Sequence, residues 1–161
     1  MDLYSHANTY VQGNECLKIY YCKHPDNVSV WNPKDGKQIC QTISETVAYN
    51  HPQSRQLYIL IFHQCIHVEN LDHHLLCSMQ CQINSVDVNE TPNFLLKIPT
   101  DTSHALVVDD TDGMVPMIVS LSITNVTSYF PCRKLTHTKL EDCDVLQIDF
   151  TAEAPYWYRL D

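Results

Sequence analysis

The chain has 161 residues, enough for one domain with a hydrophobic core, and its 44% hydrophobic and 18% charged residues exclude a disordered polypeptide. Its formal net charge of -9, with only ten scattered Lys and Arg residues, argues against direct binding of nucleic acid. No apolar run reaches the ~20 residues of a membrane helix, and the N-terminus has neither the basic start nor the apolar stretch of a secretory signal. We therefore expect a cytoplasmic or nuclear chain that is neither secreted nor bound to a membrane, with its eight cysteines reduced.

Short stretches rich in β-branched and aromatic residues alternate with turn signals along the chain, and each of them predicts a strand. In chain order they cover residues 17–21, 28–31, 39–49, 56–68, 104–108, 116–123 and 145–150. The 56–68 segment is too long and too apolar for an exposed edge, so we place it in the centre of the sheet. The fold class is mainly β, as a small barrel or a sandwich-like domain.

One main helix is predicted at about residues 72–83, with Asp72 as its N-cap. Its apolar positions at helical spacing are Leu75, Leu76, Met79 and Ile83. A second, short helix is predicted at 137–143. No linker divides the chain, so we assign residues 1–150 to a single β domain and 151–161 to an acidic, aromatic C-terminal tail.

Histidines and cysteines gather in the middle of the sequence and form the only candidate metal site, with five members: His63, Cys65, His67, Cys77 and Cys81. Regular alternation would point the first three to one face of a strand, and the two last cysteines share a helical face at i,i+4. None of the usual zinc-ligand spacings is present, and thiols beside a leucine stripe are more often packing residues. We therefore favour no metal here and expect no cofactor.

The N-terminal segment 3–11 reads Leu-Tyr-Ser-His-Ala-Asn-Thr-Tyr-Val. It resembles the Leu-Asp-Ser-His-Ala-Asp-Thr-Cys-Val motif of the retropepsin-like aspartic-protease region in copia-type retrotransposon polyproteins. Further matches follow in the order expected of that family, at 47–49 with 57–64, 71–80, 89–95, 102–105, 126–131 and a closing pattern that ends at Trp157. Each match is weak alone, but their order and spacing extend the resemblance over nearly the whole chain.

The resemblance implies a small closed barrel of the retropepsin type that forms homodimers, partly through terminal strands. Each subunit of such a dimer donates one aspartate, and the two carboxylates share a proton and activate a water. The position that matches the aspartate is Tyr4, and a phenol is an uncharged, weak base near neutral pH. The degenerate motif is Tyr4, Ser5, His6, Ala7, Asn8 and Thr9.

Two residues near the motif are poor replacements for the missing acid. Asp2 is a weak substitute, because two positions along a strand place it ~7 Å from Tyr4. Asn8 carries an amide and cannot act as a base. Only three residues precede Tyr4, so we also expect the N-terminal strand to be truncated.

The leading hypothesis is therefore a degenerate, catalytically inactive aspartic-protease-like domain, a remnant or an interaction module, located in the cytoplasm, the nucleus or virus-like particles. One alternative is a residual endopeptidase that processes a retrotransposon polyprotein through Asp2 or through an active partner subunit. The other is a metal-stabilised binding module built on the segment from His63 to Cys81. The expected partners are a second copy of the chain and, if activity remains, a peptide or polyprotein substrate.

Overall fold

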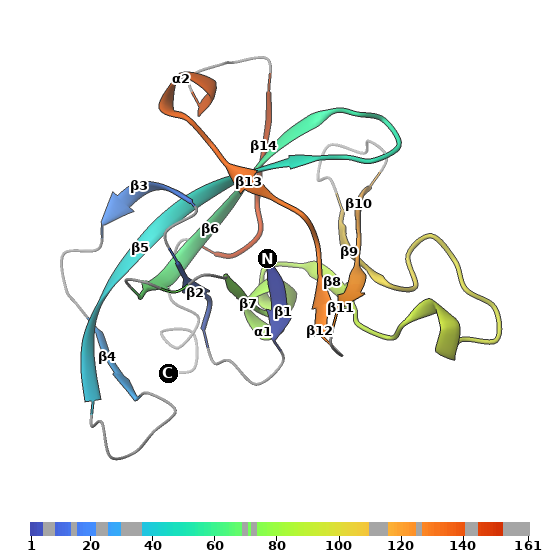
Figure 1. Cartoon of the computed structure of the whole chain (residues 1–161), viewed down its shortest axis with the longest axis horizontal. Coiled ribbons are helices and arrows are strands. Elements are labelled where there is room, and N and C mark those ends of the chain that lie inside the picture. Colours follow the sequence, from blue (N-terminus) through green and yellow to red (C-terminus); the bar gives the residue numbers. More distant parts are fainter. Residues whose placement is uncertain are drawn as a thin grey trace.

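The computed structural model describes residues 1–4, 9–13, 16–21, 26–29, 37–68, 71, 74–109, 116–124, 127–140 and 145–152, and these are mainly β (Figure 1). The first strands are β1 (Asp2–Tyr4), β2 (Val11–Gln12), β3 (Leu17–Tyr21), β4 (Asp26–Ser29), β5 (Lys37–Asn50), β6 (Leu57–His67) and β7 (Leu75–Cys77). The later strands are β8 (Val86–Asn89), β9 (Ala105–Val108), β10 (Met117–Ser120), β11 (Ser122–Thr124), β12 (Thr127–Tyr129), β13 (Arg133–Lys134) and β14 (Leu146–Asp149). The helices are α1 (Ser78–Ile83), the 3-10 turn η2 (Asn93–Leu95) and α2 (His137–Leu140). Within these described ranges, no helix has the length and apolar character needed to cross a membrane.

The long hairpin of β5 and β6 organises the larger sheet. The strands follow the order β11-β12-β1-β7-β2-β6-β5-β13, with β14 added to β6 and with β3 and β4 added to β5. The central position predicted for the 56–68 segment is confirmed, because β6 pairs with β2, β5 and β14. A continuous run of apolar and β-branched residues fits such a strand, which is covered on both faces.

The predicted closed barrel is wrong for the part of the chain that the structure describes. The path through the sheet is open and ends at β11 and β13. It does not close because the later strands attach to separate stretches of the long β5 and β6 instead of continuing around the sheet. The mainly-β class is confirmed, and the described residues form no closed barrel.

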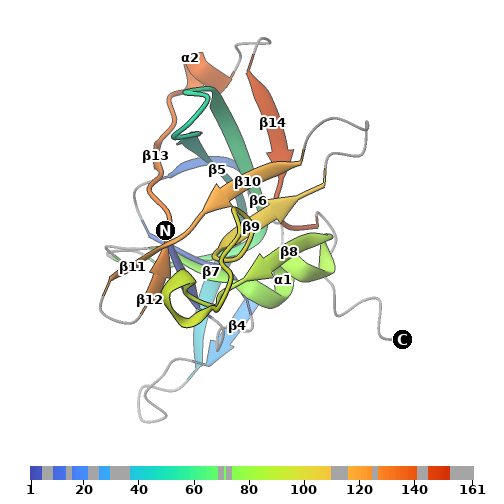
Figure 2. The same ribbon diagram turned by 90° about the vertical axis from the view of Figure 1, so that its right-hand side faces the viewer.

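The predicted strand at 116–123 is divided between two sheets. Residues before Leu121 form β10, which joins β9 and β8 in a separate three-stranded sheet, whereas β11 pairs with β12 of the larger sheet. The buried Leu121 donates its backbone N–H to the His104 carbonyl at 2.9 Å where the chain changes sheet. Figure 2 shows α1 lying against β8 of the smaller sheet.

The main helix is shorter than predicted, because residues Leu75–Cys77 form strand β7 in place of its first turns. β7 pairs in parallel with β1, and Leu76 and Cys77 are fully buried there. This pairing with a strand distant in sequence overrides the local helical periodicity. The proposed cap Asp72 lies outside the described residues. The short helix predicted at 137–143 is confirmed over α2, and its last three residues also lie outside.

A bulge in the central hairpin changes the direction of the side chains along β6. Ile43 pairs with Cys65 and Glu45 with Phe62, so Ser44 alone stands opposite His63 and Gln64. Gln64 has φ of 57°, the left-handed conformation often found in bulges. The extra residue places His63 and Cys65 on opposite faces, so the prediction that these two and His67 share one face is wrong.

The larger hydrophobic core is built from both sheets and from α1. Tyr10 stacks on Phe62 with ring centroids 5.0 Å apart, and Phe62 contacts Phe150 at 5.3 Å. Other fully buried members of this core are Val47, Leu60, Leu76, Leu106, Val119 and Phe130. The aromatic contacts join Phe150, the residue after β14, through β6 to Tyr10 in the N-terminal segment.

Candidate functional site

The N-terminal motif begins at the end of a strand that lies inside the sheet. β1 pairs in parallel with β7 on one side and antiparallel with β12 on the other, and Tyr4 is the Cα partner of Cys77. Ser5, His6, Ala7 and Asn8 lie outside the described residues. The described chain resumes at Thr9, close to the start of β2.

Gln80 of α1 holds the segment that follows the motif. Its Oε1 accepts the Tyr10 backbone N–H at 2.6 Å, and its Nε2 donates to Thr9 Oγ1 at 3.1 Å. Thr9 in turn donates its hydroxyl to the Gln64 carbonyl at the bulge, at 3.0 Å. One amide side chain thus fixes two consecutive residues of the loop, with donor and acceptor both used.

Asp2 is part of the β ladder. Its backbone N–H donates to the His74 carbonyl at 2.8 Å, and its Cα partners are Leu75 and Tyr129. Asp2 and Tyr4 are two residues apart in one strand, a spacing of ~7 Å along a regular strand.

The core contains a carboxyl group that sequence reasoning missed. Glu45 is fully buried in β5, between Ile43 and Val47 on the same alternating face. Burial raises its pKa to about 7, while the nearby Cys16 thiol and Tyr10 hydroxyl oppose part of that rise. These two groups face the carboxylate without completing a well-formed hydrogen bond to either of its oxygens. The sequence could have indicated this buried acid, because Glu45 lies on the apolar face of the strand predicted at 39–49.

The groups around Glu45 are kept in their neutral forms. Burial, and secondarily the Glu45 charge, raises the pKa of the Tyr10 hydroxyl and of the Cys16 and Cys65 thiols. A thiol must ionise to act as a nucleophile or as a metal ligand, so these groups are chemically inert in the folded chain. Cys16, Cys40, Cys65, Cys77, Cys81 and Cys132 are thiols and not disulfides.

Ser44, His63 and Asp149 form a hydrogen-bonded row that resembles a hydrolytic triad only in composition. Ser44 Oγ lies 2.9 Å from His63 Nδ1, and His63 Nε2 lies 3.3 Å from Asp149 Oδ1. A hydrolase exposes its serine and buries its acid. Here the serine is buried and the aspartate side chain is 60% exposed, so the row links β5, β6 and β14 and does not present a nucleophile.

The candidate metal residues are not gathered into one site. Lys18 Nζ lies 2.8 Å from His67 Nε2, which makes a zinc ion at that nitrogen unfavourable, whereas Cys77 and Cys81 are buried at the start and inside of α1. Throughout the described ranges, no three His, Cys, Asp or Glu side chains are placed to hold a metal ion. The bulge contributes to this, because it places His63 and Cys65 on opposite faces of β6.

Comparison with known proteins found no match: no family model, no curated protein and no solved structure is similar to this chain.

Proposed function

We propose that this chain is a retropepsin-like domain of a copia-type retrotransposon polyprotein that has lost its proteolytic chemistry and acts as a non-catalytic module. The observation that carries the proposal is the contact between two segments that the resemblance singles out separately. Thr9 belongs to the N-terminal motif and Gln80 to the helix motif about 70 residues later, and their side chains are hydrogen-bonded at 3.1 Å. Contact between the two motifs is what we expect if together they anchor the same loop.

The loss of catalysis follows from the side chains available near that loop. Peptide hydrolysis by a paired-acid mechanism needs one carboxylate from each of two subunits. Tyr4 offers a phenol, and Asp2 lies two residues away in the same strand. Among the residues that the structure describes, the carboxyl group with a raised pKa is that of Glu45, which is fully buried in the core and cannot reach a peptide substrate.

The proposal is tested by restoring the acid. The wild-type protein, offered a family cleavage-site peptide between about pH 4 and pH 7, should give no pepstatin-sensitive cleavage. Tyr4→Asp should gain such cleavage, and Tyr4→Asn, which is polar but cannot ionise, should not.

Pepstatin-sensitive cleavage by the wild type that disappears in Asp2→Asn would instead establish the residual-peptidase alternative. A folded, dimeric Tyr4→Asp that still does not cleave would count against position 4 as the catalytic position. Metal analysis of the purified wild type adds an independent check, because a stoichiometric zinc content would favour the metal-stabilised module.

A further inference from the structure

A buried acid and a half-buried cation stand opposite each other on neighbouring strands. Lys18 of β3 and Glu45 of β5 are Cα partners in an antiparallel pair. The side chains of directly opposite residues lie on one face of the sheet, with their Cβ atoms ~5 Å apart. Glu45 is fully buried, whereas Lys18 is half-buried. Lys18 and Glu45 therefore have the register of a cross-strand ion pair.

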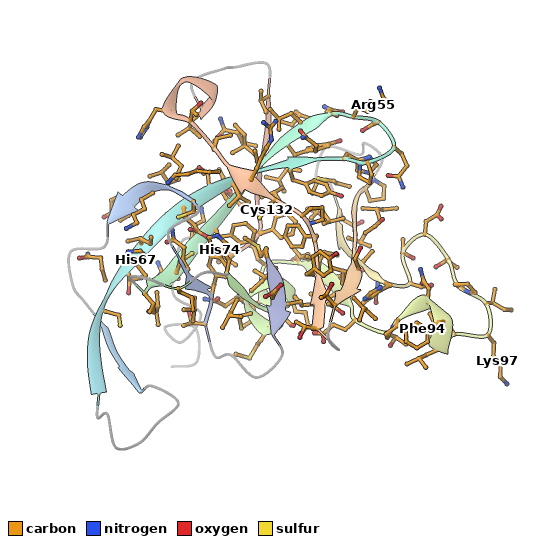
Figure 3. All side chains as sticks on the ribbon, viewed as in Figure 1. Arg55, His67, His74, Phe94, Lys97 and Cys132 are labelled. Atoms are coloured by element: carbon orange, nitrogen blue, oxygen red, sulfur yellow. The ribbon has the colours of Figure 1, made fainter. Side chains whose placement is uncertain are left out.

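The Lys18 ammonium is directed to another partner, because its Nζ lies 2.8 Å from Nε2 of His67. An ammonium has donors and no acceptor, so Nε2 accepts this hydrogen bond and the imidazole is neutral, with its proton on Nδ1. The contact joins β3 to the last residue of β6. Figure 3 labels His67 on the side of the molecule where β3 and β5 lie together. Neither oxygen of Glu45 has a well-formed hydrogen bond in this arrangement.

The titratable groups that act on Glu45 come from several parts of the described chain. They are Tyr10, Cys16, Lys18, Cys65 and Cys132. The phenol and the thiols are neutral and can donate a hydrogen bond at most, so they do not balance a negative charge. Within this described set, the counter-charge can come only from Lys18.

The protonation state of Glu45 decides where that ammonium is most stable. A protonated carboxyl needs no counter-charge, so Lys18 can stay on His67. An ionised carboxylate without a partner in the core is among the costliest states of a folded chain. The contact between Lys18 and His67 is half-exposed, and water can replace the hydrogen bond at both groups with little loss. Ionisation of Glu45 therefore favours movement of the ammonium toward the carboxylate.

We propose that Lys18 is a proton-controlled switch, which donates to His67 while Glu45 is protonated and moves to Glu45 when that carboxyl ionises. The register of β3 and β5 allows the exchange through side-chain rotation alone. Burial raises the pKa of Glu45 to about 7, so the exchange takes place near neutral pH.

The contact that Lys18 leaves lies where β6 holds the strand that follows the N-terminal motif. Val68, the residue after His67, donates its N–H to the Gln12 carbonyl at the end of β2, at 2.9 Å. The switch thus connects the protonation of a core acid to the tie between β3 and this end of β6. Tyr4 takes no part in it, so the switch and the proposed function can each fail while the other holds.

The first test compares three proteins at pH 8.5, where an ordinary imidazole is neutral and an ordinary lysine is charged. The nitrogen resonance of His67 Nε2 reports whether a donor is present. In the wild type it should coincide with that of Lys18→Met, which has no donor, and in Glu45→Gln it should keep the position of a hydrogen-bonded nitrogen. A wild-type resonance that coincides with that of Glu45→Gln would overturn the proposal.

The second test follows the carboxyl carbon resonance of Glu45 as pH rises. Removing the ammonium in Lys18→Met should raise the pKa of Glu45 by at least about one pH unit, which makes it a tenfold weaker acid. Lys134→Met is the matched control, because Lys134 acts on Cys16 but is not among the groups that act on Glu45, and it should change this pKa by less than about 0.3 units. Equal changes in the two variants, or a wild-type Glu45 still protonated at pH 8.5, would contradict the switch.

Discussion

The core around Glu45 and the connection between β8 and β9 (residues 90–104) reverse the usual distribution of residues in opposite ways. Glu45, an ionisable side chain, is fully buried with neither oxygen in a well-formed hydrogen bond. Phe94 and Ile98, two large apolar side chains, are about four-fifths exposed. A buried acid costs folding free energy in the isolated chain, whereas an exposed apolar patch costs little until a partner covers it. The first departure therefore affects the stability of the isolated chain, and the second does not.

The largest effect that this comparison predicts is a pH dependence of stability that comes from Glu45. Its pKa is about 7 in the folded chain against 4.5 as the ordinary value. Below about pH 4.5 both states hold the proton, so the group adds no pH dependence. Between pH 4.5 and about pH 7, Glu45 is ionised in the unfolded chain but stays protonated in the folded chain, so the free energy of unfolding falls as pH rises. Above pH 7 the accumulated loss is roughly 3 kcal/mol.

Urea unfolding of the wild type and of Glu45→Gln between pH 4.5 and pH 8 measures this loss. The free energy of unfolding of Glu45→Gln minus that of the wild type should increase with pH up to about 7 and then level off, because glutamine cannot ionise. The pKa of His104 is lowered by burial, which adds the opposite slope, and the subtraction removes it because both proteins contain His104. Asp87→Asn, at an exposed acid, is the control and should show no such growth. Parallel pH profiles for wild type and Glu45→Gln would contradict the assignment.

The second effect concerns Gln80, which lies between the core and the N-terminal motif. Gln80→Ala leaves the buried Tyr10 N–H without its acceptor, and the expected loss is about 2 kcal/mol. The matched control is Gln82→Ala on the exposed side of the same helix, with a change below about 0.5 kcal/mol. Hydrogen exchange at the Tyr10 amide should accelerate in the first variant only. Equal losses in both variants would mean that the helix and not the loop anchor is responsible.

The sequence predicted the long strands well and the departures from regular geometry poorly. β5 and β6 were predicted to within two residues at each end, because β-branched and aromatic runs of that length have few alternatives. The bulge at Gln64 was not predictable, since no glycine or asparagine marks the residue with positive φ. Leu75 and Leu76 satisfy a helical stripe and a buried strand equally well, and only pairing with β1 decides between them.

The candidate site was predicted less completely than the fold. The resemblance named Thr9 and Gln80 separately, but their contact depends on how α1 packs against the loop, and periodicity carries no such information. Glu45 could have been found, since it interrupts the apolar face of a predicted strand. The row from Ser44 through His63 to Asp149 joins three strands and has no local signature.

The smallest effect on stability is expected at the connection between β8 and β9, and it sharpens the contrast with Glu45. In dilute solution Phe94→Ser/Ile98→Ser should change the free energy of unfolding by no more than about 0.5 kcal/mol, because both side chains are exposed before and after folding. Urea unfolding measures the change, and Met79→Ser, which removes a 42% exposed apolar side chain from α1, is the matched control. A loss of more than about 1 kcal/mol in the double variant would show that these side chains pack against their own chain, and the contrast with the costly core acid would fail.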